Sequence, residues 1–529
     1  MCIPTPTPGP PLTFGEAMRA AVREHGDQQA YVEGARTLTF AEWDRAAAGV
    51  AERLAGRGVR PGEVVALLLP SGIDFAIAYA AVLRLGAVVT AVNTRLGAHE
   101  VGAILRASSP ALVVRDDTVP WPAIDPGTRV IGHDDIDWAA APTCEPGPAS
   151  TSRPDDAAVI IWTSGTTGVP KGAWYDHRGL AAAVASAGAI GGRRERRLFS
   201  TPFAHAGYLA KVVEQLVSGS TLVVSPQPWS VQDMARLLVD ERIDLAGGVP
   251  TQWAKLLTVP GLDRAVLPHL RVGVAATAPA SPELVEAVRE RLGCSLVVRY
   301  AMTEAPSITG TDPADPPAVQ SRTVGRPQAG MAVRIVDADD VEVGGGETGH
   351  VQVRGACVMR GYWQAPALTE AAFCGDWLRT GDLGWIGHGG NLVLVGRSKE
   401  MYIRGGYNVY PLEVEHELAD HPKVARVAVI GVETPVLGER GMAWVVPTDP
   451  DDPPTLRELR EHVGARLADY KSPDDLRLVP ELPVTAMLKV DKTALQRLGD
   501  PGSVDVRVGG APTAPGSTPP APAPPRGDS

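Results

Sequence analysis

Cysteine is scarce in this chain of 529 residues. Its five cysteines are scattered, and no two of them form a Cys-x-x-Cys pair: Cys2, Cys144, Cys294, Cys357 and Cys374. An odd number of scattered cysteines argues against a disulfide-stapled scaffold, and the missing pair argues against a structural zinc site. The cysteine pattern therefore predicts a protein of the reducing cytoplasm.

Long uninterrupted apolar runs are also absent. The longest run, from Ala76 to Val92, is broken by Arg84 and Gly86, so it predicts a core helix and a strand and not a membrane span. The residues after Met1 are rich in proline and lack the apolar stretch of a signal peptide. The formal net charge of −11 argues against a protein that coats nucleic acid. We therefore expect no membrane span and no nucleic-acid partner.

A regular alternation of short apolar runs and helical patterns fills the first 300 residues. Buried strands are expected at 64–69, 88–92, 159–162, 222–225, 272–275 and 296–299, and helices at 40–57, 230–241 and 281–292. Strands that alternate with helices in this way build largely parallel sheets covered by helices. From about 333 to 395 the pattern changes to short strands and Gly-rich turns, which indicates a smaller β-rich portion.

The last part of the chain has a different composition. A compact α+β unit is expected there, with helices at 411–419 and 455–467 and strands at 425–432, 442–446 and 476–479. The Pro/Ala/Gly-rich end predicts disorder. The fold class expected is α/β, with a large N-terminal domain at 12–396, a small mobile C-terminal domain at 397–499 and a disordered tail at 500–529.

The segment Thr163–Gly172 has the most informative composition. It holds four hydroxyl side chains, three glycines and one lysine directly after an apolar run. Glycines let the backbone approach an anion closely, and the hydroxyls and the lysine supply donors, which favours polyphosphate over a mobile surface turn. A Walker motif is not indicated, because Pro170 precedes Lys171 and Gly172 follows it.

Four further segments carry polar groups in suggestive places. Tyr300–Glu304 follows a predicted strand, at the edge of the sheet where α/β proteins bind ligands. Arg379–Asp382 places a carboxylate in a predicted turn, which suits a ribose diol but is also typical of an ordinary aspartate turn. The segment 396–400 lies at the change of composition and predicts a hinge. The segment 483–489 presents Lys489 on a loop, where a lysine alone is usually a surface charge.

Taken in order, these segments resemble the adenylate-forming superfamily of acyl-CoA synthetases, peptide-synthetase adenylation domains and luciferases. The resemblance covers roughly Phe14 to Lys492 and is closest to the acyl-CoA synthetases. Three intermediate segments also agree with it: Pro202-Phe203-Ala204-His205, Val324-Gly325-Arg326-Pro327, and Gly346 to Val351 leading to Gly361-Tyr362-Trp363.

The resemblance implies an ATP site. The phosphates would lie against Thr163, Ser164, Gly165, Thr166, Thr167, Gly168 and Lys171. The adenine would lie between Tyr300 and the backbone of Ala276, Thr277 and Ala278, and the ribose would meet Asp382 and Arg397. Thr303 would contact the α-phosphate, and Glu304 would hold Mg²⁺, a cation that prefers carboxylate and phosphate oxygen.

The resemblance also implies two roles for the small domain. Lys489 would reach the carboxylate and the α-phosphate during adenylation. The domain would then rotate about Lys399, and Gly405 and Gly406 would let the pantetheine of CoA pass close to the backbone. Four positions depart from the family: Trp162 replaces a tyrosine, Ala301 a glycine beside the acyl pocket, Leu488 the glycine before the lysine, and Lys492 an arginine.

The expected reaction is ATP-dependent activation of a carboxylic acid to an acyl-adenylate, followed by transfer to CoA. The segment around His205 lacks the aspartate typical of amino-acid activation, which favours a fatty, aromatic or bulky polycyclic acid. His205 either lines the pocket or is a packed, hydrogen-bonded histidine. The alternatives are an enzyme that stops at acyl-AMP or passes the acyl group to a carrier protein or a separate ligase, a luciferase-type oxidase, and a silent nucleotide-binding regulator.

Overall fold

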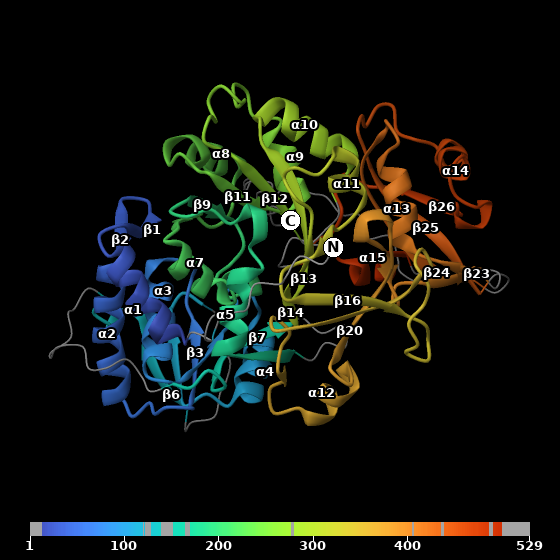
Figure 1. Ribbon diagram of the computed structural model, residues 1–529. Helices are drawn as coiled ribbons and strands as arrows, with labels where there is room; N and C mark the ends of the chain where they lie inside the picture. The colour runs from blue at the N-terminus through green and yellow to red at the C-terminus, as the bar shows by residue number, and fades with distance from the viewer. Residues whose placement is uncertain are drawn as a thin grey trace, which may run out of the picture.

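The computed structural model describes residues 13–119, 121, 128–138, 152–163, 170–276, 280–404, 407–434, 438–485 and 490–499. The tail predicted to be disordered, 500–529, lies outside the described residues. Two large sheets with helices form the N-terminal part, followed by a smaller antiparallel sheet and a separate α+β unit (Figure 1). This arrangement confirms the predicted α/β fold with a large N-terminal domain and a smaller C-terminal domain.

A nine-stranded sheet carries the residues of the later site. Its order among the described residues is β15 (Arg326–Pro327), β14 (Ala305–Gly310), β13 (Ser295–Met302), β12 (Val272–Ala276), β11 (Leu245–Gly248), β9 (Arg196–Phe199), β10 (Thr221–Val224), β1 (Gln29–Glu33) and β2 (Arg36–Thr39). The strands from β13 to β1 are parallel, and β2, β14 and β15 pair antiparallel at the two edges. The predicted parallel core is thus confirmed, with antiparallel edges added.

A seven-stranded sheet supports the predicted phosphate loop. Its order in the described part is β18 (Gly361–Tyr362), β8 (Lys171–Asp176), β7 (Ala157–Thr163), β4 (Val88–Ala91), β3 (Val64–Leu68), β5 (Leu112–Arg115) and β6 (Arg129–Gly132). The strands from β7 to β6 are parallel, whereas β7 pairs antiparallel with β8 so that Thr163 lies opposite Lys171. The ends of the predicted loop are therefore held side by side.

The main core lies between these two sheets. It includes side chains from both sheets and from α1 (Phe14–His25), α2 (Phe40–Gly56), α3 (Ile73–Arg84), α5 (His177–Ala185), α6 (Ala206–Leu209) and α7 (Val212–Ser218). Helix α3 is buried at almost every position from Ile73 to Leu83, which explains its apolar sequence on all sides. On its outer face the nine-stranded sheet packs against α8 (Val231–Asp240), α9 (Pro250–Leu256) and α10 (Pro282–Leu292).

Shorter helices and an antiparallel sheet complete the large domain. The remaining described helices of this part are α4 (Ala98–Ser108), α11 (Pro317–Arg322) and α12 (Pro366–Ala372). The small sheet contains β16 (Met331–Val336), β17 (Gly349–Gly355), β20 (Trp377–Ile386), β19 (Phe373–Cys374) and β21 (Leu392–Arg397). The turn predicted at Arg379–Asp382 is wrong: these residues lie within strand β20, which tolerates the sequence because Gly381 adopts a φ of +76°.

The C-terminal unit has its own sheet and core. Its strands are β22 (Tyr402–Arg404), β23 (Tyr407–Val409), β24 (Val424–Thr434), β25 (Gly438–Pro447) and β26 (Asp475–Leu478), and its helices are α13 (Pro411–Ala419), α14 (Leu456–Gly464) and α15 (Lys492–Gly499). Apolar residues of α13, α14 and the central strands pack together inside it. In Figure 1 this unit, in orange and red, lies beside α11 and β16.

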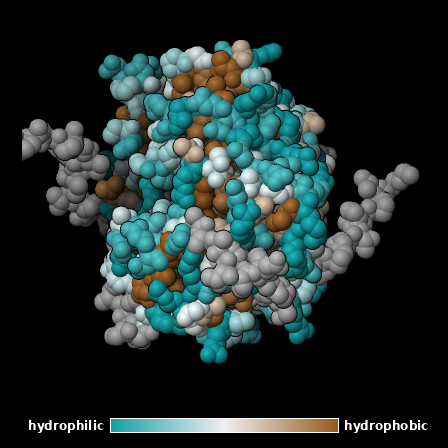
Figure 2. Space-filling view, turned by 90° about the vertical axis from the view of Figure 1, so that its left-hand side faces the viewer, coloured by the Kyte–Doolittle hydropathy of each residue, from teal (hydrophilic) through white to brown (hydrophobic). Residues whose placement is uncertain are grey.

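The surface has the character expected of a folded domain with a buried apolar core. The face in Figure 2 is mainly hydrophilic, and hydrophobic residues gather on it in separate patches. Among the described helices, none is both long enough and apolar enough to cross a membrane.

Gly325 joins the small sheet to the edge of the nine-stranded sheet. Its carbonyl accepts from the backbone N–H of Leu392 at 2.8 Å, and the N–H of Val324 donates to the Leu392 carbonyl at 2.9 Å. Gly325 has a φ of +76°, and a Cβ there would lie 2.0 Å from the backbone of Gly310. Only glycine fits this close approach.

We expect Gly325→Ala to be far more destabilising than Gly330→Ala. Gly330 has a similar φ of +81°, but a Cβ there meets nothing within 4 Å. The control should therefore lose only about 1 kcal/mol of stability, which is the cost of a left-handed backbone. Gly325→Ala should lose ~2 kcal/mol more through overpacking. Equal losses for the two variants in urea unfolding would contradict this assignment.

Candidate active site

The carboxylate of Asp382 joins the main sheet to the small sheet. The Tyr300 hydroxyl, near the end of β13, donates a hydrogen bond to Asp382 Oδ2. On the other side Arg397 Nε donates to Asp382 Oδ1 at 2.9 Å, because the two residues face each other across β20 and β21. The structure thus brings together three predicted nucleotide ligands that are up to 97 residues apart in the sequence.

The ionisation states suit this arrangement. Burial, and then the negative charge of Asp382, raise the pKa of Tyr300 well above its ordinary value, so the phenol remains a donor. Burial works against the charge of Arg397, but the carboxylate of Asp382 outweighs it and raises the guanidinium pKa. The Arg397 side chain is 49% exposed, while that of Asp382 is only 9% exposed. A buried anion is therefore held under a cation that reaches solvent.

A second set of contacts links Glu304 to the predicted phosphate loop. The Tyr362 hydroxyl donates to Glu304 Oε1 at 2.8 Å, and Lys171 Nζ lies 5.4 Å from the centre of the Tyr362 ring. The Tyr175 hydroxyl donates to the carbonyl of Thr303 at 2.5 Å. Strand β8, which carries Lys171 and Tyr175, thus lies beside the turn after β13.

Glu304 is a buried carboxylate, with 9% of the residue exposed. Among ion pairs between described residues, none involves Glu304. Its charge nevertheless acts on its neighbours: burial and then Glu304 raise the pKa values of Tyr175 and Tyr362. A buried anion is costly without a cation nearby, so the residue fits a magnesium ligand that shares its ion with phosphate oxygens.

Several predicted site residues cannot be placed. Those outside the described residues are Ser164, Gly165, Thr166, Thr167, Gly168, Thr277, Ala278, Gly405, Gly406, Leu488 and Lys489. Their described neighbours Thr163 and Lys171 pair across β7 and β8, and Ala276 ends β12 opposite Arg299. The roles expected for all these residues stay predictions.

His205 caps a helix beside a pocket. Its Nδ1 accepts from the N–H of Gly207 at 3.2 Å, at the start of α6. The pocket next to it is lined mainly by residues of β9, β10, α6 and α7, among them Phe199, Thr201, Gly207 and Lys211. The side chain of His205 is thus hydrogen-bonded within the fold, while its predicted part in the reaction stays a prediction.

Two polar side chains beside the predicted site residues were not singled out from the sequence. Tyr362 lay in a segment noted only for its family resemblance, and its partner Glu304 is 58 residues away. Lys211 is a single cation between Ala210 and Val212, both buried. Its position inside an apolar helical pattern was the available signal.

Comparison with known proteins finds similarity over most of the chain. The AMP-binding enzyme family matches residues 18–363, and the AMP-binding enzyme C-terminal domain matches residues 413–489. A 3-[(3aS,4S,7aS)-7a-methyl-1,5-dioxo-octahydro-1H-inden-4-yl]propanoyl:CoA ligase of Mycobacterium tuberculosis (strain ATCC 25618 / H37Rv) is 36% identical, over 92% of this chain and 99% of that protein.

Two solved structures are similar over nearly the full length. ATP-bound MatB from Rhodopseudomonas palustris has a TM-score of 0.83 at 27% identity, covering 92% of this chain and 99% of that one. The amide bond synthetase McbA from Marinactinospora thermotolerans has a TM-score of 0.82 at 29% identity, covering 91% and 99%.

Replacing Tyr300 by phenylalanine should change the pH dependence of stability. The folded pKa is raised above the ordinary value of 10.0, so the phenol stabilises the fold fully below pH 10, and this contribution is lost as the pH rises further. Each such tyrosine contributes a slope of about 1.4 kcal/mol per pH unit in that range.

Tyr300→Phe should therefore lower the free energy of unfolding by about 1–2 kcal/mol at neutral pH, through the lost hydrogen bond. Above pH 10 its stability should fall less steeply than that of the natural chain. Urea unfolding on both sides of pH 10 measures the two slopes, and equal slopes would show that the phenol is not held in its neutral form.

Proposed function

Because the chain belongs to the AMP-binding enzyme family, we propose that it is an AMP-forming acid–thiol ligase. It activates a carboxylic acid with ATP, releases pyrophosphate, and transfers the acyl group from the acyl-adenylate to CoA. The observation that supports this best is that Tyr300 and Arg397 both donate to the carboxylate of Asp382. We also propose a cytoplasmic location, in agreement with the scattered cysteines.

The described residues suit the binding of a nucleotide. Tyr300 offers its ring to the adenine, and its hydroxyl holds the carboxylate of Asp382 in place. That carboxylate has further lone pairs with which to accept hydrogen bonds from a ribose diol. Lys171, at the start of β8, supplies positive charge beside the phosphates.

Glu304 and Thr303 would lie near the reacting phosphate. Magnesium, when bound, would neutralise charge on the phosphate oxygens and act as a Lewis acid. The hydrogen bond from Tyr362 fixes the orientation of the Glu304 carboxylate. The contact from Tyr175 to the Thr303 carbonyl fixes the backbone of the same turn.

The two half-reactions need different groups at the reaction centre. In the first, a carboxylate oxygen attacks the α-phosphorus and the bond to pyrophosphate breaks, so Lys489 would stabilise negative charge that builds on the phosphate. In the second, the thiol sulfur of CoA attacks the acyl carbon and AMP leaves. Movement of the small domain would exchange Lys489 for the segment with Gly405 and Gly406.

A second candidate function is transfer of the acyl group to an acceptor other than CoA, such as a carrier protein or the substrate of a separate ligase. The similarity to an amide bond synthetase and the substitution of leucine at position 488 favour keeping it. A screen of carboxylic acids for pyrophosphate release, with and without CoA, distinguishes the two. Acid-dependent pyrophosphate release without any acyl-CoA would favour the second candidate, and no AMP formation with any acid would contradict both.

Lys489→Ala should slow adenylation strongly. Removal of one preorganised cation from such a site typically costs about 10²–10³ in rate, while ATP binding should remain because the other contacts are intact. The matched control is Lys423→Ala, since Lys423 lies in the same domain and pairs with Asp452 and Glu458. Pyrophosphate release by Lys489→Ala at the rate of the control would remove Lys489 from the mechanism.

Glu304→Gln should raise the magnesium requirement. The amide keeps the shape and the contact with Tyr362 but removes the charge, so the Mg²⁺ concentration for half-maximal pyrophosphate release should rise by about tenfold. Removal of the metal by EDTA should stop the reaction of the natural chain and reduce its affinity for ATP in calorimetry. Glu347→Gln, at an exposed position, is the control; an unchanged magnesium requirement in Glu304→Gln would contradict the assignment.

A further inference from the structure

The pocket beside α6 and α7 contains cations in an otherwise mostly apolar lining. Phe199, Phe203, Tyr208 and Val212 form apolar walls, and Lys211 and Arg197 add positive charge. Arg197 pairs with the carboxylates of Glu195 and Glu214, so its charge is accounted for within the fold. Lys211, whose side chain is 26% exposed, is the cation that lines the pocket with donors left for a ligand.

The pocket and the predicted reaction site share one edge of the nine-stranded sheet. Strands β9, β11, β12 and β13 are parallel, so their carboxyl ends share one edge of the sheet. Thr201 follows β9 at this edge, and Tyr300 lies near the end of β13. Phe203, Tyr208 and Tyr300 also belong to one continuous core. An acid that reacts near Tyr300 can thus extend along α6 toward Lys211.

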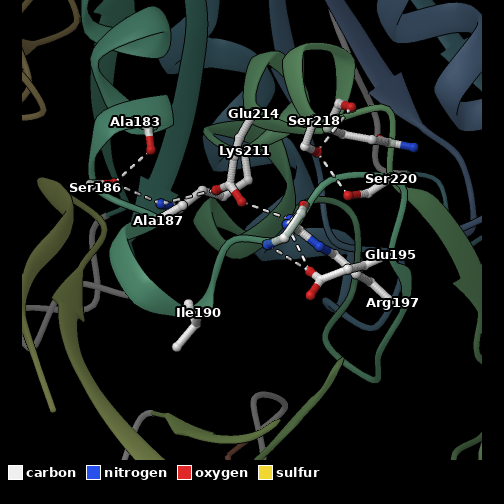
Figure 3. Close-up of polar contacts among 12 residues, drawn as sticks. Ala183, Ser186, Ala187, Ile190, Glu195, Arg197, Lys211, Glu214, Ser218 and Ser220 are labelled. Atoms are coloured by element: carbon white, nitrogen blue, oxygen red, sulfur yellow. Dashed lines mark hydrogen bonds and ion pairs between the residues drawn. The ribbon is translucent and has the colours of Figure 1, made fainter. Parts of the chain in front are cut away.

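The ammonium group of Lys211 has two polar contacts in the fold, and these do not use all of its donors. Its Nζ donates to Ser186 Oγ at 3.1 Å, and its distance to Glu214 is 3.7 Å (Figure 3). Glu214 pairs more closely with Arg197, at 2.7 Å. An ammonium group has three N–H donors, so the Lys211 ammonium keeps donor capacity beyond these contacts.

Other cations add to the positive charge of this region. Arg299 donates to the carbonyl of Ala187 at 3.4 Å, next to the residue that Lys211 contacts. Burial lowers the pKa of Arg299 to about 10, and Glu214 is the main charge that opposes this shift. Glu214 therefore faces Arg197, Lys211 and Arg299 at once. Figure 3 shows Lys211 and Arg197 on different sides of Glu214.

We propose that Lys211 determines specificity in the acid pocket, by donating a hydrogen bond to an acceptor at the far end of the acid, either a ketone carbonyl or a second carboxylate. This inference rests on the proposed function, since it names the class of acid that the enzyme activates. A site built to bond a polar group rejects an analogue that lacks it, because the buried donor is then left without a partner. Plain alkanoic acids should therefore be poor ligands.

Three matched acids test the proposal: heptanoate, 6-oxoheptanoate and heptanedioate, each titrated calorimetrically into the full chain. The natural chain should bind at least one of the two acceptor-bearing acids about tenfold more tightly than heptanoate. In Lys211→Met this ratio should fall to about one, and in Lys211→Arg part of it should remain. The control Lys255→Met, at an exposed position over the Trp229 ring, should keep the full ratio.

The outcomes separate this proposal from the proposed function. Equal binding of all three acids, no binding of any of them, or a preference that survives Lys211→Met would overturn the role of Lys211. The larger of the two ratios identifies the ketone or the carboxylate as the preferred acceptor. Binding with the expected preference but without pyrophosphate release from ATP would support Lys211 and contradict the ligase activity. Thermal unfolding of Lys211→Met checks that the variant is folded, as expected since Arg197 still neutralises Glu214.

Discussion

The position of one buried carboxylate, Asp382, governs the geometry of the whole site. It accepts from Tyr300 on the nine-stranded sheet and from Arg397 at the end of the small sheet. A buried carboxylate is tolerated only when such donors satisfy it, and the loss of either donor leaves its charge uncompensated. The same bonds therefore fix the two sheets relative to each other and keep the charge of Asp382 where a ribose would meet it. Stability and the proposed ribose contact would therefore depend on one set of contacts.

The backbone makes this contact possible. Gly325 lets the segment before β15 pass directly over Gly310, and its bonds to Leu392 bring β21 against the edge of the main sheet. Gly381 supplies a left-handed residue inside β20 just before Asp382. At Gly325 a side chain would collide with the backbone of Gly310, whereas at Gly381 a Cβ meets nothing within 4 Å and the constraint is the left-handed φ alone. The polar contacts are thus a consequence of close backbone packing, which explains why segments far apart in the sequence meet.

The parts of the fold and site that could be predicted from the sequence are those set by residues close together in the chain. Strands such as β3 and β12 and helix α8 were predicted because their apolar periodicity is local and Ser230 caps the helix start. The turn predicted around Asp382 was wrong, because Gly and Asp favour turns locally while pairing with β17 and β21 imposes a strand. Tyr362 and Lys211 were not predicted as site residues, because the residues that they contact lie in other helices and strands. The local sequence pattern therefore predicts helices and strands. A site built from contacts between distant segments can be identified only once the fold is known.

The hinge predicted at Lys399 can be compared with the contacts on either side of it. On one side, Arg397 is bound to Asp382 and the N–H of Ser398 donates to Gly381 at 3.0 Å, so both are anchored to the large domain, although the predicted boundary assigned them to the small one. On the other side, Lys492 bonds Glu400 at 2.9 Å and Glu415 at 2.8 Å, and these carboxylates outweigh burial and raise the pKa of the lysine. Glu400 is therefore tied to α13 and α15. The N–H groups of Glu400 and Met401 both donate to the carbonyl of Arg397, at 3.0 and 3.2 Å. A rotation about exposed Lys399 that keeps the two side-chain anchors would therefore have to break these two backbone bonds.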